Sequence, residues 1–216
     1  MTDPKDLIAR RVARELKEGD RVNLGIGLPT LVAAHLPPGM QVFFHSENGI
    51  MGMSLLPGEG FEDRNLTDAG GRAVGAVPGA CAFDSAFSFG LIRGGHLDLT
   101  VLGGLEVDER GQLANWMVPG RMVPGMGGAM DLVTGARRVI VAMTHRSPGG
   151  AKIVRECRLP ITSVRRVDLV VTELAVIRPT PDGLVLAETQ PGVSVDEVIA
   201  ATEARLIVAP DLVARR

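Results

Sequence analysis

Aromatic residues are scarce in this chain: they make up 3% of its 216 residues, and tyrosine is absent. Proteins that bind single-stranded nucleic acids stack the bases on aromatic side chains, so the composition argues against that function. The net charge of −2 also lacks the positive footprint that a nucleic acid or an anionic membrane surface attracts. We therefore expect neither a nucleic acid nor a membrane as a partner.

Long apolar runs are missing as well, and cysteines are few. No run approaches the ~20 residues of a membrane span, and the N-terminal segment Met1–Lys5 is polar and charged. The sequence therefore predicts a cytoplasmic protein. Cys81 and Cys157 lie far apart without a metal-like spacing, and we expect both to be reduced, half-buried thiols.

Metal and dinucleotide motifs are not found either. The histidines share no i, i+3 or i+4 spacing, so metal binding has little support; they are His35, His45, His96 and His145. Gly25–Thr30 is a glycine-rich turn after an apolar strand, but it lacks the third glycine and the later acidic residue of the dinucleotide fingerprint. We expect no metal and no bound cofactor.

The apolar runs that are present predict an α/β fold. Hydrophobic residues make up 45% of the chain, and no repeat or composition break divides it, so we expect one domain over residues 1–216. Continuous β-branched runs at 138–143 and 167–172 are typical of strands buried on both faces, as in parallel sheets. Further strands are expected at 21–27, 41–45 and 97–102. The fold class is thus a mostly parallel central sheet flanked by helices.

Capping residues predict the positions of the helices. Asp3 and Pro4 start a first helix, and Gly19 is its expected stop. Asp84-Ser85 caps a short helix that Gly94-Gly95 terminates. Helical segments are expected at 29–36, 86–92 and 129–133.

The C-terminal region contains one more helix signal, and the middle of the chain contains a long irregular segment. Ser194–Glu197 is a capping box, which predicts a final helix ending near Arg205. Its apolar residues are expected to face the core (Val198, Ile199 and Ala201). Met51–Pro78 is punctuated by Gly, Pro and Asp, and we expect an irregular stretch there; loops of this length usually carry function or wrap a partner.

The segment Phe43–Ile50 places a carboxylate at the end of an apolar strand. Glu47 is followed directly by Asn48-Gly49, a strong turn signal. Ligands of open α/β sheets gather outside the carboxyl ends of the strands, so Glu47 is a candidate site residue. The alternative is a surface glutamate that opens a loop, and the octapeptide alone does not decide between them.

A second unusual region runs from Leu113 to Leu132 and contains Gly127-Gly128 before a helical turn. Such glycines leave backbone N–H groups free to hold a developing oxyanion, although a flexible surface loop fits the pattern equally well. Trp116 is expected to be packed and not to serve as a ligand platform. A carboxylate nucleophile needs only an electrophilic acyl group and oxyanion donors, so the chemistry mildly favours covalent acyl transfer through Glu47.

Ser46-Glu47-Asn48-Gly49 resembles the SENG element of the family I coenzyme A transferases, in which the glutamate accepts the acyl group. Other segments resemble the same family in the same order along the chain. These segments are Asn23–Thr30, Leu91–His96, Leu113–Trp116, Gly125–Leu132 and Val171–Val176. The resemblance covers about Ile8 to Ala209, and it is closest to the β subunit of the two-subunit 3-oxoacid type.

The resemblance implies a ping-pong transfer of coenzyme A between an acyl-CoA, such as acetyl- or succinyl-CoA, and a 3-oxo acid such as acetoacetate. Glu47 would carry a glutamyl-CoA thioester, and the backbone amide of Gly128 would hold the oxyanion. The pocket would be shaped by Gly27, Ser46, Asn48, Gly49 and Gly127. Coenzyme A is then a substrate, and no cofactor is needed.

The resemblance also implies a separate α subunit, usually in an α2β2 assembly, and small carboxylic acids as substrates. Many relatives continue with Gly-x-Gly-Pro after the SENG element, whereas this chain has Gly52–Pro57, so the preferred acid stays open. Alternatives are a 3-oxoadipate CoA-transferase β subunit, an acyl-CoA hydrolase on the same fold, and a non-catalytic subunit that supports an active partner.

Overall fold

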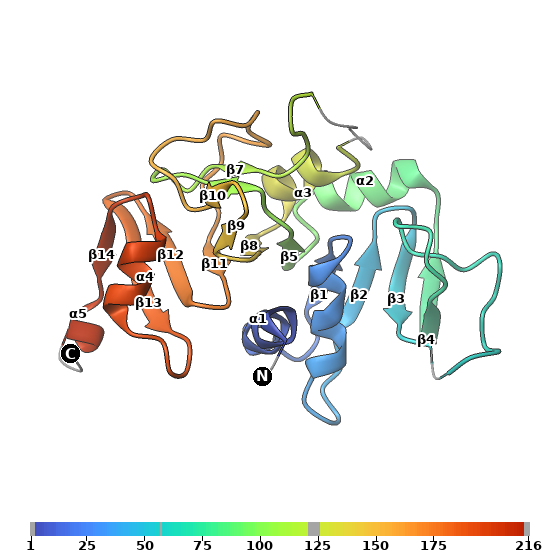
Figure 1. Ribbon diagram of the computed structural model, residues 1–216. Coiled ribbons are helices and arrows are strands. Elements are labelled where there is room, and N and C mark those ends of the chain that lie inside the picture. The colour runs from blue at the N-terminus through green and yellow to red at the C-terminus, as the bar shows by residue number, and fades with distance from the viewer. Residues whose placement is uncertain (1–2, 57, 121–125, 214–216) are drawn as a thin grey trace.

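The computed structural model describes residues 3–56, 58–120 and 126–213. Within these residues a ten-stranded sheet runs in the order β14-β13-β12-β11-β8-β5-β1-β2-β3-β4, from one end of the molecule to the other (Figure 1). Its strands are β1 (Arg21–Leu24), β2 (Phe43–Ser46), β3 (Ile50–Ser54), β4 (Gly75–Ala82), β5 (Leu99–Leu102), β8 (Arg138–Ala142), β11 (Leu169–Val171), β12 (Ala175–Thr180), β13 (Gly183–Thr189) and β14 (Leu206–Val208).

Two small antiparallel sheets and six helices accompany the large sheet in the part of the chain that is described. The small sheets pair β6 (Glu106–Val107) with β7 (Leu113–Ala114) and β9 (Arg146–Ser147) with β10 (Gly150–Ala151). The helices are α1 (Pro4–Ala13), the 3-10 helix η1 (Leu28–His35), α2 (Ser85–Arg93), α3 (Ala129–Gly135), α4 (Val195–Ala201) and α5 (Pro210–Val213). No helix among the described residues is long and apolar enough to cross a membrane.

The centre of the sheet is parallel, as predicted. Strands β2, β1, β5, β8 and β11 pair in parallel, whereas β3 and β4 at one end and β12 and β13 at the other are antiparallel. The two β-branched runs form β8 and β11, and β11 is buried along its whole length. The predicted α/β class with a mostly parallel sheet is confirmed.

Each face of the sheet has its own hydrophobic core, because alternate residues of a strand point to opposite faces. On one face α1 and η1 pack with Ile140 of β8. On the other face α2, α3 and α4 pack with the neighbouring Val139 and Val141. Figure 1 shows α1 on the opposite side of the sheet from α2 and α3. Both faces of the central strands are therefore covered by helices.

The prediction of an irregular stretch over Met51–Pro78 is wrong at both of its ends. Residues 50–54 form β3 and residues 75–82 form β4, which pair antiparallel. Gly52 occupies a positive φ of 91° at the shift in pairing register between Met51 and Met53, so the glycine that suggested a loop marks an irregular position in a strand. Pro78 is tolerated because β4 is the edge strand. Pro57 lies outside the described residues, as does Gly125 at the start of the segment Gly125–Leu132.

The helices predicted at the two ends of the chain, α1 and α4, end earlier than expected. Asp3 caps α1 as expected, but α1 ends at Ala13 and i→i+3 turns continue to Leu16, so Gly19 is not the end of the helix. The capping box of Ser194 is confirmed. Helix α4 nevertheless ends at Ala201, well before Arg205, because Thr202 is extended and its hydroxyl donates to the Val198 carbonyl at 2.7 Å.

Some expected burial is also wrong. Ile199 was expected in the core, but it is 42% exposed and only Val198 on that helix turn is fully buried. Cys81 was expected to be half-buried, but it is exposed because it lies on the edge strand β4. Cys157 is partly buried, as predicted, and burial raises the pKa of its thiol to about 12.

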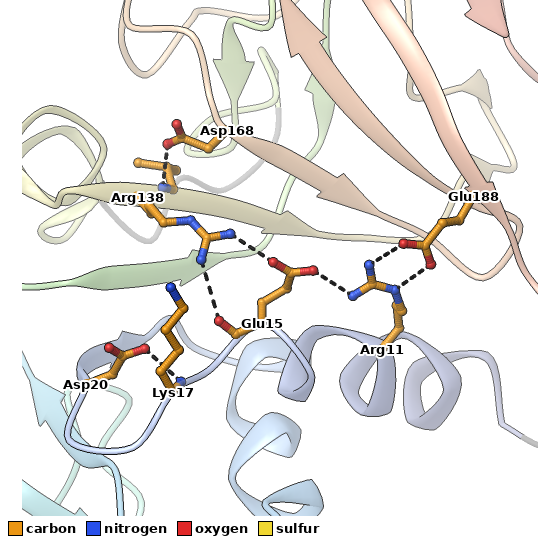
Figure 2. Close-up of polar contacts among 8 residues, drawn as sticks. Arg11, Glu15, Lys17, Asp20, Arg138, Asp168 and Glu188 are labelled. Atoms are coloured by element: carbon orange, nitrogen blue, oxygen red, sulfur yellow. Dashed lines mark hydrogen bonds and ion pairs between the residues drawn. The ribbon is translucent and has the colours of Figure 1, made fainter. Parts of the chain in front are cut away.

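Ion pairs gather where the central strands begin (Figure 2). Glu15, just after α1, pairs with Arg138 at the start of β8 at 2.8 Å and with Arg11 at 2.9 Å. Arg11 also pairs with Glu188 of β13 at 2.7 Å. This cluster, called the α1 ion-pair network below, ties α1 to the parallel strands and to the C-terminal hairpin.

Candidate active site

Glu47 follows the last residue of β2 and lies in a tight turn. Gly49 closes this turn by donating its N–H to the Ser46 carbonyl at 3.0 Å, and it adopts a φ of 122°. A Cβ at Gly49 would collide with the Phe83 carbonyl, so only glycine fits. The turn thus holds Glu47 directly beyond the carboxyl end of β2.

Gly128 provides the contact that holds the Glu47 carboxylate. Its N–H donates to Glu47 Oε1 at 2.9 Å, across 81 residues of sequence. A Cβ at Gly128 would collide with Oε2 of Glu47, and a Cβ at Gly127 would lie 3.0 Å from Oε1. The backbone can approach the carboxylate this closely only because both positions are glycine.

The environment of Glu47 disfavours its charge. Burial raises the pKa of Glu47 above its ordinary value, the hydrogen bond from Gly128 lowers it in part, and the negative charge of Asp131 raises it again. Among the described residues no salt bridge to Glu47 is found. The result is a poorly solvated carboxylate whose hydrogen-bond donor, as far as the structure describes the chain, is a backbone amide.

A cavity of about 430 Å³ opens beside Glu47. It lies at the carboxyl ends of three adjacent parallel strands, β1, β2 and β5, where α/β sheets usually bind ligands. The described residues that line it are Asn23, Leu24, Gly25, Ile26, Thr30, Ser46, Glu47, Met53, Asp68, Ala69, Gly70, Leu102, Gly103, Gly104, Leu105, Asn115, Trp116, Met126, Gly127, Gly128, Ala129 and Leu132. The wall is mostly apolar, with bare glycine backbone near the carboxylate.

The structure brings together some of the predicted site residues. Ser46, Glu47, Gly127 and Gly128 line this cavity. Their chemical roles remain predictions, because a position on the cavity wall does not show what a residue does in a reaction. Trp116, which was expected to be packed, is half-buried and lines the same cavity.

The other predicted residues are not among the cavity-lining residues. Asn48 donates its side-chain amide to the Thr67 carbonyl at 2.7 Å, and Gly49 closes the turn. Gly27 precedes η1 with a φ of 85°, and its carbonyl accepts the Thr30 hydroxyl at 2.7 Å. In this structure these three residues shape the backbone around the cavity.

Residues 68–70 line the cavity but were missed by sequence reasoning. Ser46 Oγ accepts the Ala69 N–H at 2.9 Å, which places this loop over the end of β2. Asp68 holds the loop in shape by accepting the N–H groups of Gly70 and Arg72. The length of the segment between β3 and β4 was the available signal, because long loops often carry function, but it did not indicate which residues reach the cavity.

Asn115 also lines the cavity, but its side chain serves the backbone. Its amide nitrogen donates to the Gly103 carbonyl at 3.1 Å, and its oxygen accepts the Thr162 hydroxyl at 2.7 Å. Across the described residues no group of three or more His, Cys, Asp or Glu is arranged to hold a metal ion. The groups best placed for chemistry at the cavity are therefore a carboxylate and a backbone N–H.

Comparison with known proteins gives consistent results. A family model described as coenzyme A transferase matches residues 5–201. The beta chain of acetate CoA-transferase of Escherichia coli K12 is 54% identical over 215 residues, which are 99% of this chain and 98% of that protein. One of the subunits of the succinyl-CoA:3-ketoacid coenzyme A transferase of Helicobacter pylori 26695 is 50% identical over 94% of this chain and 99% of that protein.

A solved structure has the same fold. The acyl-CoA transferase YdiF of Escherichia coli O157:H7, solved as the apoenzyme, superposes with a TM-score of 0.78 at 24% identity. The match covers 97% of this chain but only 42% of the YdiF chain. This chain therefore corresponds to less than half of that longer protein.

Proposed function

This chain belongs to the coenzyme A transferase family, and on that premise we propose that it is the catalytic β subunit of a 3-oxoacid CoA-transferase. The observation that carries the proposal is the Glu47 carboxylate, held at 2.9 Å from the Gly128 N–H beside a largely apolar cavity. The names of the two curated relatives support the reaction class. The substrates proposed are a short acyl-CoA, such as acetyl- or succinyl-CoA, and a 3-oxo acid such as acetoacetate.

The transfer proceeds in two half-reactions. The Glu47 carboxylate attacks the thioester carbonyl of the donor, the C–S bond breaks, and an acyl-glutamyl anhydride and coenzyme A thiolate form. The thiolate attacks the glutamyl carbonyl and displaces the donor's carboxylate, leaving a glutamyl-CoA thioester. The acceptor acid reverses these steps, so the energy of the thioester is conserved and no cofactor other than the substrate coenzyme A takes part.

The Gly128 amide is suited to the second of these attacks. When the thiolate adds to the glutamyl carbonyl, negative charge develops on an oxygen of Glu47 itself. The N–H of Gly128 already donates to that carboxylate in the free protein. It can therefore hold the developing oxyanion without reorganisation, which is how such donors accelerate acyl transfer.

Burial of Glu47 favours the first attack. A well-solvated carboxylate is a weak nucleophile because its hydration must be removed before it reacts. Burial, the main cause of the raised pKa of Glu47, removes part of that hydration in advance. Met126 and Ile26 lie on the cavity wall and can shield the reactive thioester from water.

We further propose that the chain acts with a separate α subunit, in an α2β2 assembly. The curated relatives are named as subunits, and the YdiF chain is more than twice as long as the part that this chain matches. A cytoplasmic location remains part of the proposal.

The proposal is tested by trapping the thioester. The chain and its α subunit are mixed with acetoacetyl-CoA, reduced with borohydride and digested; the reduced glutamate is expected at position 47. Glu47→Ala should lower CoA transfer by about 10⁴-fold or more, since the reaction has no other nucleophile. Glu156→Ala, at a side chain that is 77% exposed, is the matched control and should transfer CoA normally.

Two results would contradict the proposal. Full transfer by Glu47→Ala would show that the nucleophile lies elsewhere, as in a supporting subunit. Rapid release of acid in water without an acceptor would indicate an acyl-CoA hydrolase. A series of acceptor acids, with 3-oxoadipate among them, then identifies the substrate.

A further inference from the structure

His45, two residues before Glu47, is completely buried and hydrogen-bonded on both ring nitrogens. Its Nδ1 lies 3.2 Å from Asn23 Nδ2, and its Nε2 lies 2.9 Å from Ser88 Oγ. Thr100 Oγ1 donates to Asn23 Oδ1 at 3.3 Å. This chain of four side chains, called the His45 network below, crosses from β5 through β1 and β2 to α2, and none of the four is more than 2% exposed.

The partners fix the tautomer of His45. Asn23 Nδ2 also lies 3.2 Å from the His45 carbonyl, which can only accept, so this atom is the amide nitrogen. Asn23 therefore donates to Nδ1 as well, and the proton of the neutral ring resides on Nε2, where it is donated to Ser88. Burial lowers the pKa of His45 to about 4, in agreement with a neutral ring.

The ring of His45 also reaches, through Phe83, the turn that carries Glu47. It stacks on Phe83, with the ring centroids 6.2 Å apart and the planes at 17°. The Phe83 N–H donates to the Gly49 carbonyl at 2.9 Å, and its carbonyl blocks any side chain at Gly49. His45 thus supports the turn from the strand before Glu47 and, through Phe83, at Gly49, two residues after Glu47.

Through Ser88 the network reaches the other half of the site. Ser88 lies in α2, which packs on α3, the helix that Gly128 precedes. The contact is close at both ends: a Cβ at Gly128 would touch Phe89 of α2, and a Cβ at Gly135 would collide with the Ile92 carbonyl. A shift of α2 relative to β2 would therefore change the separation of Glu47 and the Gly128 amide.

We infer that His45 is a positioning residue, which links β2 to α2 and so holds the Glu47 carboxylate against the Gly128 N–H. The inference rests on the proposed function of Glu47. His45 forms no hydrogen bond with Glu47 among the described contacts, so it acts through the backbone and not as a base. It is expected to affect the chemical step and not the binding of acyl-CoA.

A second buried histidine provides the matched control. His145 is also completely buried, and its ring nitrogens lie 3.0 Å from Thr172 Oγ1 and 2.8 Å from Thr202 Oγ1. Burial lowers the pKa of His145 to about 4 as well. It does not line the Glu47 cavity, and neither of its partners does. The two histidines therefore share burial, charge state and bonding, and they differ in what they support.

The test compares four variants in the complex with the α subunit. Readouts are kcat per trappable site, KM for acetoacetyl-CoA, and the melting temperature. His45→Leu should lower kcat by about 10²-fold, the effect of misplacing reacting groups by ~1 Å, while KM changes little. His45→Gln keeps an acceptor and a donor and should restore most of kcat. Ser88→Ala, which removes little volume, should lower kcat by about tenfold in the same manner.

His145→Leu should lower the melting temperature and leave kcat per site unchanged. The inference is overturned if His45→Leu or, should that variant not fold, Ser88→Ala retains the wild-type kcat per site. It is also overturned if His45→Gln falls as far as His45→Leu. Failure of the proposed function is a different result, because the wild-type complex would then transfer no CoA and no glutamate would be trapped at position 47.

Discussion

The two ends of the parallel strands differ in how their charged side chains are paired. Where β1, β5 and β8 begin, carboxylates and guanidinium groups are paired: Arg21 and Arg137 contact Asp98 at 2.8 and 2.9 Å, and the α1 ion-pair network lies alongside (Figure 2). Where β1, β2 and β5 end, the hydrogen bond that Glu47 accepts within the described part of the chain comes from a backbone N–H. Charged side chains are thus paired with opposite charges where the strands begin. Where the strands end, beside the cavity, the Glu47 carboxylate is held by a backbone amide that carries no full charge.

Glu15 and Glu47 show the difference in one residue type. Burial alone would raise the pKa of Glu15, but hydrogen bonds from Arg138 and Arg11 outweigh burial and lower it. At Glu47 burial prevails over the single hydrogen bond, and the pKa is raised. A partly buried carboxylate thus stabilises the fold when cations surround it, whereas without them it remains reactive at the expense of stability.

Gly128→Ala should have the largest effect of the variants that test this comparison. The new methyl group would collide with Glu47 Oε2 and displace the carboxylate from the Gly128 N–H. We expect kcat to fall by about 10²- to 10³-fold, the usual cost of losing one oxyanion donor. Gly90→Ala in α2 is the control, because nothing lies within 4 Å of its new methyl group. Steady-state kinetics of both variants would decide; equal kcat values would contradict the assignment.

Glu15→Gln tests the ion pairs at the beginning of the strands. It leaves Arg11 and Arg138 without their shared carboxylate, at a side chain that is 22% exposed. The free energy of unfolding should fall by about 1–3 kcal/mol, the cost of losing hydrogen bonds to charged partners. Urea denaturation measures this loss, and kcat per folded site should not change. A variant as stable as the wild type would show that the α1 ion-pair network contributes little.

A fall in pH should affect Glu47 and Glu15 differently, because their pKa values are shifted in opposite directions. Protonated Glu47 cannot attack, and its pKa is raised, so kcat/KM should already decline above pH 4.5, the ordinary value for glutamate. Below the pKa of Glu47 the decline is about tenfold per pH unit. A profile that stays flat down to pH 4.5 would contradict the burial argument.

For Glu15 the pKa is lowered in the folded state, so its stabilisation is complete above pH 4.5, the unfolded value, and is lost as the pH falls through the lower folded pKa. The stability difference between wild type and Glu15→Gln should therefore shrink in acid. Denaturation curves measured at a series of pH values would show this. A difference independent of pH would mean that the carboxylate charge is not what stabilises the network.

The smallest effect is expected from an exposed pair. Arg110 and Glu156 lie 3.8 Å apart with side chains 71% and 77% exposed. Glu156→Gln should change the free energy of unfolding by less than about 0.5 kcal/mol, because water and salt screen such pairs. The same urea titration applies. A loss comparable to that of Glu15→Gln would remove the distinction between paired and exposed charges on which the comparison depends.

Local signals predicted a good part of this molecule. The β-branched runs gave β8 and β11, and the side chains of Asp84 and Ser194 cap α2 and α4 as expected. These features depend on residues close in sequence. The strands β12, β13 and β14 were not predicted, and β3 and β4 were hidden by glycine and proline, since their pairing depends on partners and not on local preference.

Only part of the candidate site could be predicted from the sequence, for the same reason. A strand end followed by Asn-Gly marked Glu47 as a candidate, and bare glycines marked Gly127-Gly128, but their contact spans 81 residues. Hydrophobic periodicity cannot predict a contact between residues so far apart in sequence. The chemistry of a carboxylate nucleophile mildly favoured it, and the resemblance to the coenzyme A transferases implied it. The His45 network needs β1, β2, β5 and α2 in place before its bonds exist, so nothing in the neighbourhood of His45 in the sequence indicated it.

The cavity wall has a consequence for measurement. Trp116 is the chain's single tryptophan, there is no tyrosine, and its indole lines the cavity. Its Nε1–H is buried without an acceptor among the described residues, although buried indoles usually have one. Fluorescence of this chain therefore originates from one ring at one place. A substrate or a partner subunit that packs against this ring in the cavity is expected to change its emission, which a fluorescence titration without a label would record.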